Sequence, residues 1–166
     1  SLTIVIGSMP ISVLLTDPES AMEAQTQEME STQRIDFPAK AENIALAENL
    51  IDEACTKHQV HESLYGNILI ALTEAVNNAI HHGNALDPTK TVSLAYEVTG
   101  GQIVFHVQDQ GPGFDFEHLP DPTDPQNIEK PHGRGVFLMR ALADRVEFND
   151  HGASVALSFS LQPVNE

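Results

Sequence analysis

Apolar residues recur every three to four positions in the first half of the chain, the spacing of helices that bury one side. This pattern predicts a helix over residues 39–57 and a second one over about 62–82. The second helix is expected to end at Gly83-Asn84, because glycine and asparagine are favoured just after a helix. A third helix is predicted at about 135–143, after a stretch rich in proline and glycine.

Alternation of apolar and polar residues indicates strands in the second half of the chain. Alternating residues from 92 to 98, a Gly100-Gly101 turn and the apolar-rich run 103–107 predict a β-hairpin. Residues 111–131 must then form a long loop, and loops of about 20 residues are uncommon in compact domains unless they are functional. The other predicted strands are 34–37, 145–148 and 154–161, the last two forming a closing hairpin.

The order of these elements predicts one sheet with helices on one face. The expected fold is α+β, a two-layer α/β sandwich with a mixed, mostly antiparallel sheet. We expect residues 34–161 to form the domain, 1–33 to be an N-terminal tail or linker, and 162–166 a C-terminal tail.

Charge and composition narrow the classes of partner. Asp and Glu total 24 against 8 Lys and Arg, a formal net charge of −16, which disfavours direct binding to nucleic acid because phosphate backbones attract basic proteins. No apolar stretch approaches the roughly 20 residues of a membrane span. The single cysteine, Cys55, cannot form an internal disulfide and is expected to be a core thiol, which fits a cytoplasmic protein.

The second predicted helix carries a polar seam opposite its apolar side. Glu74 and Asn78 lie one turn apart on this seam. An asparagine carbonyl is a ligand that Mg²⁺ accepts beside phosphate oxygens, and a carboxylate one turn earlier can polarise an attacking hydroxyl. The alternative is a solvated helix face. The apolar side, expected to face the sheet, consists of Tyr65, Ile68, Leu69, Leu72, Val76, Ala79 and Ile80.

Asp109 follows three apolar residues of the predicted strand 103–107 and shares their register. A carboxylate directed toward the core needs a donor, because an unpaired buried charge costs several kcal/mol or becomes protonated. The exocyclic amine of adenine would be such a donor. The alternative is that the strand has ended and Asp109 opens a turn before Gly111 and Gly113, two residues that permit close approach of a ligand.

Two glycines, Gly133 and Gly135, stand immediately before the third predicted helix. Free N–H groups and the positive end of the helix dipole make such a start an anion site, although glycine is also unexceptional there. Lys130 and Arg134 are two of only eight cations in the chain, so their presence here suggests that phosphates approach this segment.

Three motifs follow one another in a specific order along the chain. They are Glu74-Ala-Val-Asn-Asn78-Ala-Ile-His-His-Gly-Asn84, Asp109-Gln-Gly111-Pro-Gly113-Phe and His132-Gly-Arg-Gly135-Val-Phe-Leu-Met. Together they resemble the boxes of the gyrase/histidine-kinase-like (GHKL, Bergerat-fold) ATPase superfamily. The short format and the Gly-Arg-Gly-Val-Phe-Leu-Met run are similar to the anti-sigma-factor serine/threonine kinases of bacterial partner-switching systems.

The resemblance implies roles at matching positions. Asn78 would bind Mg²⁺, Glu74 would be the catalytic residue that assists phosphoryl transfer, and Asp109 would read adenine. Gly111 and Gly113 would floor the base pocket, and residues from about 114 to 132 would form a lid. The other implied nucleotide-binding residues are His82, Phe114, Lys130, Gly133, Arg134, Gly135, Val136 and Ser154. Ser154 keeps a hydroxyl where the family often has threonine.

The function implied by the resemblance is a kinase that uses ATP and Mg²⁺. Such a kinase phosphorylates an antagonist (STAS-type, anti-anti-sigma) protein and sequesters a sigma factor or a similar regulator; a homodimer is among the assemblies this allows. Two alternatives remain at this stage. One is a nucleotide-dependent binding module without turnover, and the other is the ATP-binding domain of a sensor histidine kinase, with His61 as a superficial match to a phospho-acceptor.

Overall fold

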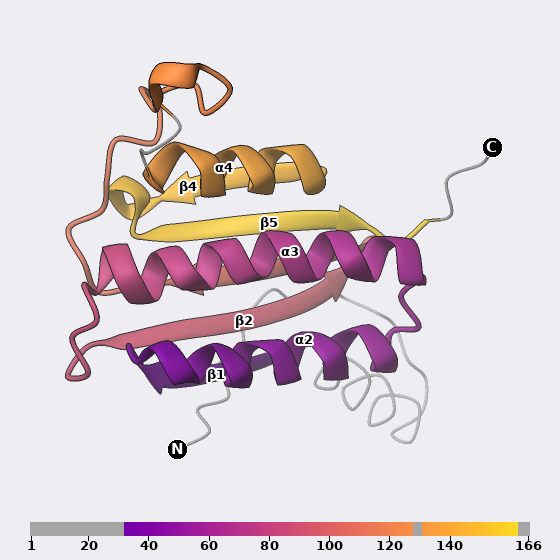
Figure 1. Ribbon diagram of the computed structural model, residues 1–166. Coiled ribbons are helices and arrows are strands. Elements are labelled where there is room, and N and C mark those ends of the chain that lie inside the picture. The colour runs from indigo at the N-terminus through magenta and orange to yellow at the C-terminus, as the bar shows by residue number, and fades with distance from the viewer. Residues whose placement is uncertain (1–31, 128–130, 163–166) are drawn as a thin grey trace, which may run out of the picture.

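The computed structural model describes residues 32–127 and 131–162 of the 166-residue chain. Two helices, a hairpin, a long loop, a third helix and a second hairpin follow the first strand, in the expected order (Figure 1). The strands are β1 (Thr32–Pro38), β2 (Thr91–Thr99), β3 (Gln102–Gln108), β4 (Arg145–Asn149) and β5 (Ser154–Ser160). The helices are α2 (Ile44–Lys57), α3 (Glu62–Asn78) and α4 (Pro131–Leu142).

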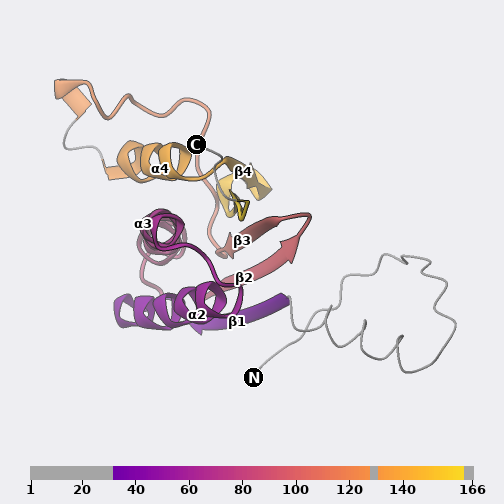
Figure 2. The ribbon, with the colours of Figure 1, turned by 90° about the vertical axis from the view of Figure 1, so that its right-hand side faces the viewer.

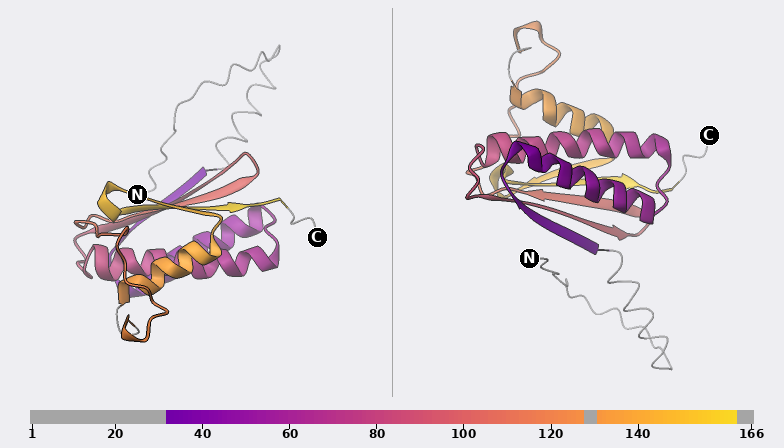
Figure 3. Two further views of the ribbon diagram at one scale, coloured as in Figure 1. Left: turned by 90° about the horizontal axis from the view of Figure 1, so that it is seen from above. Right: turned by 60° about the horizontal axis from the view of Figure 1, so that its bottom comes forward.

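The five strands form one sheet in the order β1-β2-β3-β5-β4, and the three helices lie on one of its faces (Figures 2 and 3). Every strand pair in the described part of the chain is antiparallel, so the prediction of a mixed sheet is wrong in this detail. The reason is that α2 and α3 run in opposite directions, so the chain returns to the end of β1 at Pro38. The next strand, β2, starts there beside it and runs antiparallel to it. The two-layer α+β fold is confirmed.

The core lies between the sheet and the helices, as the alternating strands predicted. Each central strand turns every second residue inward, with Phe105 of β3 and Leu157 of β5 fully buried. Tyr65 departs from the prediction, because its ring packs only at the margin of the core while its hydroxyl donates a hydrogen bond to Asp52 of α2. The expected core thiol is confirmed: Cys55 is buried, and burial, aided by nearby Asp52, raises the pKa of its thiol to about 11.

Two helix boundaries differ from the prediction in ways that concern the site. The second predicted helix stays α-helical to Asn78 and then widens into a π-helical turn, Ala79–Gly83. The last helix begins at Pro131, four residues early, so that Gly133 and Gly135 lie inside its first turns instead of before them. Proline suits a first helical position, because its missing N–H would have no partner there in any case. Among the described residues, no helix is both long enough and apolar enough to cross a membrane.

Candidate nucleotide-binding site

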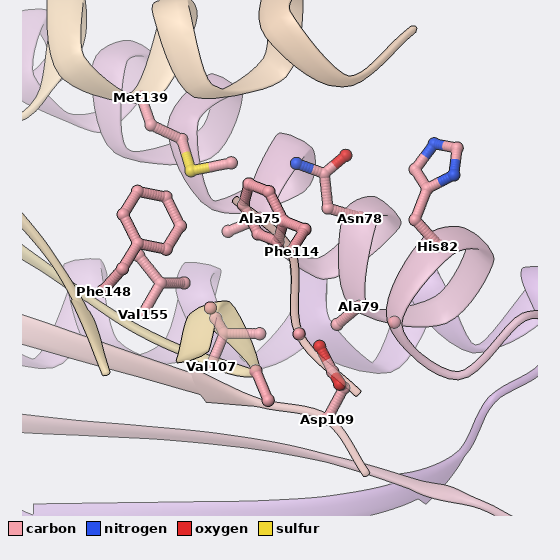
Figure 4. A pocket seen from close by; sticks show the side chains of 14 residues that line it. Ala75, Asn78, Ala79, His82, Val107, Asp109, Phe114, Met139, Phe148 and Val155 are labelled. Carbon is pink, nitrogen blue, oxygen red and sulfur yellow. The ribbon is translucent and has the colours of Figure 1, made fainter. Parts of the chain in front are cut away.

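A cavity opens where the end of α3 meets the ends of β3 and β5 (Figure 4). Its volume of about 100 Å³ greatly exceeds the roughly 10–15 Å³ that a single water needs. Asn78 and Asp109 reach it from different elements, and Met139 closes it from α4. The complete lining is Ala75, Asn78, Ala79, His82, Gly83, Val107, Asp109, Gly113, Phe114, Met139, Phe148, Gly152, Ala153 and Val155.

Asp109 extends the register of β3 into this cavity. Its backbone N–H donates to Ala153 O at 2.9 Å, which holds the residue beside β5. One carboxylate oxygen, Oδ1, accepts the N–H of Gly111 at 2.8 Å. Burial raises the pKa of the Asp109 carboxyl, an effect that the Gly111 hydrogen bond and the charge of Lys90 only partly offset. Asp109 therefore both opens a turn and directs its carboxylate into the cavity, while its recognition of adenine stays a prediction.

Glycines allow the backbone to close tightly around this carboxylate. A Cβ at Gly83 would overlap the Asp109 carboxylate, and a Cβ at Gly111 would overlap the carbonyl oxygen of Gly83. Gly113 has φ of +79°, a left-handed conformation that favours glycine, and a Cβ there would overlap the carbonyl of His151. The floor of the cavity is thus formed by closely packed backbone together with the Asp109 carboxylate.

The polar seam of α3 faces α4, not bulk solvent. A Cβ at Gly135 would lie 3.1 Å from Glu74 Oε2 and 3.1 Å from Asn78 Nδ2, so glycine lets the α4 backbone approach both side chains. Both residues are half-buried, and the alternative of a solvated helix face is wrong for them. Asn78 lines the cavity, while Glu74 lies one turn behind it.

The comparisons with known proteins agree with this geometry. A family model described as the histidine kinase-like ATPase domain matches residues 37–159.

This chain belongs to the histidine kinase-like ATPase domain family.

Curated relatives of this ATPase domain are named as a serine-protein kinase and as an anti-sigma F factor. The serine-protein kinase RsbW of Oceanobacillus iheyensis is 25% identical over 73% of this chain and 81% of the relative. The anti-sigma F factor of Clostridium perfringens is 29% identical, covering 72% of this chain and 86% of the relative. A solved structure of the RsbU and RsbW domains of Rv1364c from Mycobacterium tuberculosis matches with a TM-score of 0.57 at 20% identity, which concerns the fold alone. The match covers 80% of this chain and 33% of that one.

The family uses ATP, and the cavity of this ATPase domain suits its base. An apolar wall of Val107, Met139 and Val155 can pack on a flat ring, while Asp109 offers a desolvated acceptor at one edge. Among the described residues, no group of three or more His, Cys, Asp or Glu side chains could hold a metal. A magnesium ion would accordingly rely on Asn78 together with phosphate oxygens and waters, the mixed shell that Mg²⁺ favours.

The remaining predicted residues of the ATPase domain take several positions. His82, Gly113 and Phe114 line the cavity. Gly133 lies in the first turns of α4, where a Cβ would come within 2.6 Å of Pro120 O in the loop after β3. Arg134 is exposed, and Val136 belongs to the core. Ser154 pairs with Gln108 in the sheet and is not among the lining residues of the cavity, although its neighbours Ala153 and Val155 are. Lys130 lies outside the described residues.

An aromatic cluster borders the cavity through Phe114, which the sequence predicted, and Phe148, which it missed; Phe116 packs behind them. The Phe114 ring meets Phe148 edge-on at 5.5 Å, and the Phe116 ring stacks on Phe148 at 4.9 Å. The guanidinium of Arg140 lies 5.9 Å from the Phe148 ring centre, and it donates to Phe116 O at 3.3 Å. Alternation in β4 places Phe148 on the inner face of the sheet, but only the packing of α4 and the loop shows that it borders the cavity.

Proposed function

We propose that this protein is an ATP-dependent serine/threonine protein kinase of the anti-sigma-factor type. It would bind MgATP, phosphorylate an antagonist protein and sequester a sigma factor or a similar regulator in the alternative state. The observation that carries the proposal is the convergence of Asn78 and Asp109 on one cavity, with Glu74 held beside Asn78 at Gly135. Relatives named as a serine-protein kinase and an anti-sigma F factor support the same class.

Each residue has a role that its surroundings suit. Asp109 would accept a hydrogen bond from the exocyclic amine of adenine. This bond would offset the cost of burying the Asp109 carboxylate and would also recognise the base. Asn78 would supply a neutral oxygen to the metal, and Glu74 would orient or deprotonate the attacking hydroxyl. The N-terminal turn of α4 would offer its N–H groups to phosphates. ATP itself supplies the transferred phosphoryl group, so the protein contributes mainly positioning and charge neutralisation.

The geometry disfavours the sensor histidine kinase alternative. His61 is the N-cap of α3, where its Nδ1 accepts the N–H of Ser63 at 3.2 Å. Asn78 lies at the other end of this 17-residue helix, about 25 Å away at 1.5 Å per residue. His61 therefore cannot receive a phosphoryl group from the pocket of its own chain.

A phosphotransfer assay tests the proposal. The chain is mixed with a STAS-type antagonist protein from the same cell and with radiolabelled MgATP, and we expect label on a serine or threonine of the antagonist. Glu74→Gln should retain nucleotide binding and lose most of the transfer, because it keeps the shape and removes the carboxylate. ATP-dependent retention of a partner without any label transfer would overturn the kinase proposal in favour of a binding module without turnover.

A further inference from the structure

A closed set of hydrogen bonds next to the cavity joins Asn84, Thr91 and Gln110. Asn84 is fully buried, and among the residues whose burial the structure describes it is the one polar residue in that class. Its Oδ1 accepts the backbone N–H of Gln110 at 2.8 Å, and its Nδ2 donates to Thr91 O at 3.0 Å. The set closes through Gln110, whose Oε1 accepts the N–H of Thr91 at 2.8 Å.

These three residues join three segments of chain at one point. Asn84 ends the π-helical turn after α3, Thr91 begins β2, and Gln110 follows β3. The two amide side chains together satisfy both the N–H and the carbonyl of Thr91. Because Asn84 is fully buried and its amide would be costly to leave unpaired, its two bonds disfavour displacement of the segments at Thr91 and Gln110. The exposed bond from Thr91 to Gln110 links those two segments to each other.

The neighbours of this set are residues of the cavity. Gly83 precedes Asn84 and Asp109 precedes Gln110, so each bonded residue is one peptide from the cavity floor. The Gly83 backbone also packs against the Asp109 carboxylate so closely that a Cβ would overlap it. Any shift of the Gln110 peptide relative to Asn84 therefore moves the Asp109 carboxylate against Gly83.

We propose that Asn84 and Gln110 are positioning residues that set the direction of the Asp109 carboxylate and hence the preference for adenine over other purines. This inference rests on the proposed function, in which Asp109 reads the base. The two amides bond to the backbone of Gln110 and Thr91, next to the cavity, and act through Asp109, so their loss alters discrimination between bases.

Binding of two nucleotides that differ at the purine 6-position tests this proposal. Affinities of the full chain for MgATP and for magnesium inosine triphosphate, which carries an oxygen in place of the amine, are measured by calorimetry. We expect Asn84→Ala and Gln110→Ala to reduce the ATP-to-ITP affinity ratio by roughly tenfold, the worth of one charge-assisted hydrogen bond. Gln110→Glu keeps an oxygen acceptor for the Thr91 N–H and should retain the ratio.

A matched control separates positioning from general stability. Asp144 Oδ2 accepts the N–H of Ser160 at 2.7 Å, a side-chain-to-backbone bond at the far end of β5 from the cavity. Asp144→Ala removes such a bond and should leave the affinity ratio unchanged. A merely structural role for Asn84 would weaken both nucleotides equally, and that outcome overturns the proposal.

The same measurements distinguish failure of the inference from failure of the proposed function. A wild-type protein that binds ATP and ITP equally, or an Asp109→Asn variant with unchanged selectivity, would refute base reading by Asp109. Selectivity that depends on Asp109 but survives both Asn84→Ala and Gln110→Ala would refute only the positioning role. Gln110 is exposed, so Gln110→Ala answers the question even where Asn84→Ala fails to fold.

Discussion

At the scale of single residues, Asp109 combines two opposing requirements. In the proposed role its carboxylate accepts a hydrogen bond from adenine, and the ionised form is the stronger acceptor, yet burial raises its pKa and so disfavours that form. The Gly111 N–H compensates only in part. Residues that carry such a cost in the absence of ligand are typical of functional sites, where stability is sacrificed for recognition.

Asp109→Asn is predicted to stabilise the nucleotide-free protein at neutral pH while weakening adenine selectivity. Because the folded-state pKa lies above the ordinary value of 3.8, the folded protein holds this proton after the unfolded chain has released it. Asp109 therefore lowers stability as pH rises from 3.8 through the folded-state pKa, and the cost persists above it. Asparagine removes that cost and still offers Oδ1 to Gly111.

Thermal unfolding of both proteins as a function of pH checks this prediction. The variant should unfold at a higher temperature at pH 7, and the two curves should converge as the pH approaches 3.8 and falls below it. A wild-type protein that is the more stable of the two at pH 7 would contradict the assignment of a desolvated carboxylate.

At the scale of elements, α3 and its π-helical turn connect the core to the site. The α-helical part buries Ile68, Leu72 and Val76 against the sheet, and the wider turn that follows brings Gly83 onto Asp109. The Asn84 N–H bonds back to Ala79 O at 2.9 Å, five residues earlier, as a π-turn requires. Such turns occur often at functional sites, and here the turn sets the spacing between helix and cavity floor.

Two glycines of this element are predicted to respond differently to replacement by alanine. Gly66→Ala should raise stability, whereas Gly83→Ala should lower ATP affinity. A Cβ at Gly66, inside α3, meets nothing within 4 Å among the described residues, so Gly66→Ala should stabilise the protein by about 0.5–1 kcal/mol through helix propensity. A Cβ at Gly83 would overlap the Asp109 carboxylate, so Gly83→Ala should displace it and reduce ATP affinity by roughly tenfold or more.

Denaturant unfolding and ATP titration of both variants check this pair. Gly66→Ala serves as the control, because it makes the same chemical change on the same element without touching the cavity. Gly83→Ala binding ATP as tightly as Gly66→Ala would show that the close contact with Asp109 has no part in recognition.

At the scale of the whole molecule, the formal net charge of −16 opposes the binding of a polyanion. ATP would bring further negative charge to such a chain, and in the proposed function a magnesium ion would neutralise part of it. The described residues contain no cluster of three or more His, Cys, Asp or Glu that could hold the ion in advance. In the proposed site Asn78 is the protein ligand of the ion and phosphate oxygens complete its shell, so the metal is expected to enter with the nucleotide.

Magnesium and ATP are predicted to bind only in combination. Titration of Mg²⁺ alone should give no saturable heat at micromolar concentrations, and ATP with a chelator should bind far more weakly than MgATP. Asn78→Ala should remove most of the benefit of magnesium, because it deletes the proposed protein ligand. Tight binding of Mg²⁺ alone would contradict this account and point to a preformed metal site.

Much of the fold was accessible from the sequence, because helix and strand periods are local properties of the chain. The alternation around Phe105 and the helical spacing around Leu72 each predicted a buried face that the structure confirms. The mixed sheet was predicted wrongly, since strand direction depends on how the connecting helices pack. The start of α4 was placed four residues late, although Pro131 suits a first helical position. The three motifs indicated Asn78 and Asp109. Gly83 and Met139 lie within the motifs without an assigned role and Phe148 lies outside them, so their places around the cavity came only from the structure.

By itself, the sequence determined the elements, the acidic surface and the order of three motifs that identify an ATPase domain, because each of these follows from residue type and near-neighbour spacing. Only the tertiary structure decided that Asn78 and Asp109 meet in one cavity, that Phe148 and Met139 border it, and that Asn84 bonds to Thr91 and Gln110. These contacts join segments far apart in the chain, and their formation depends on how α3 packs across the sheet.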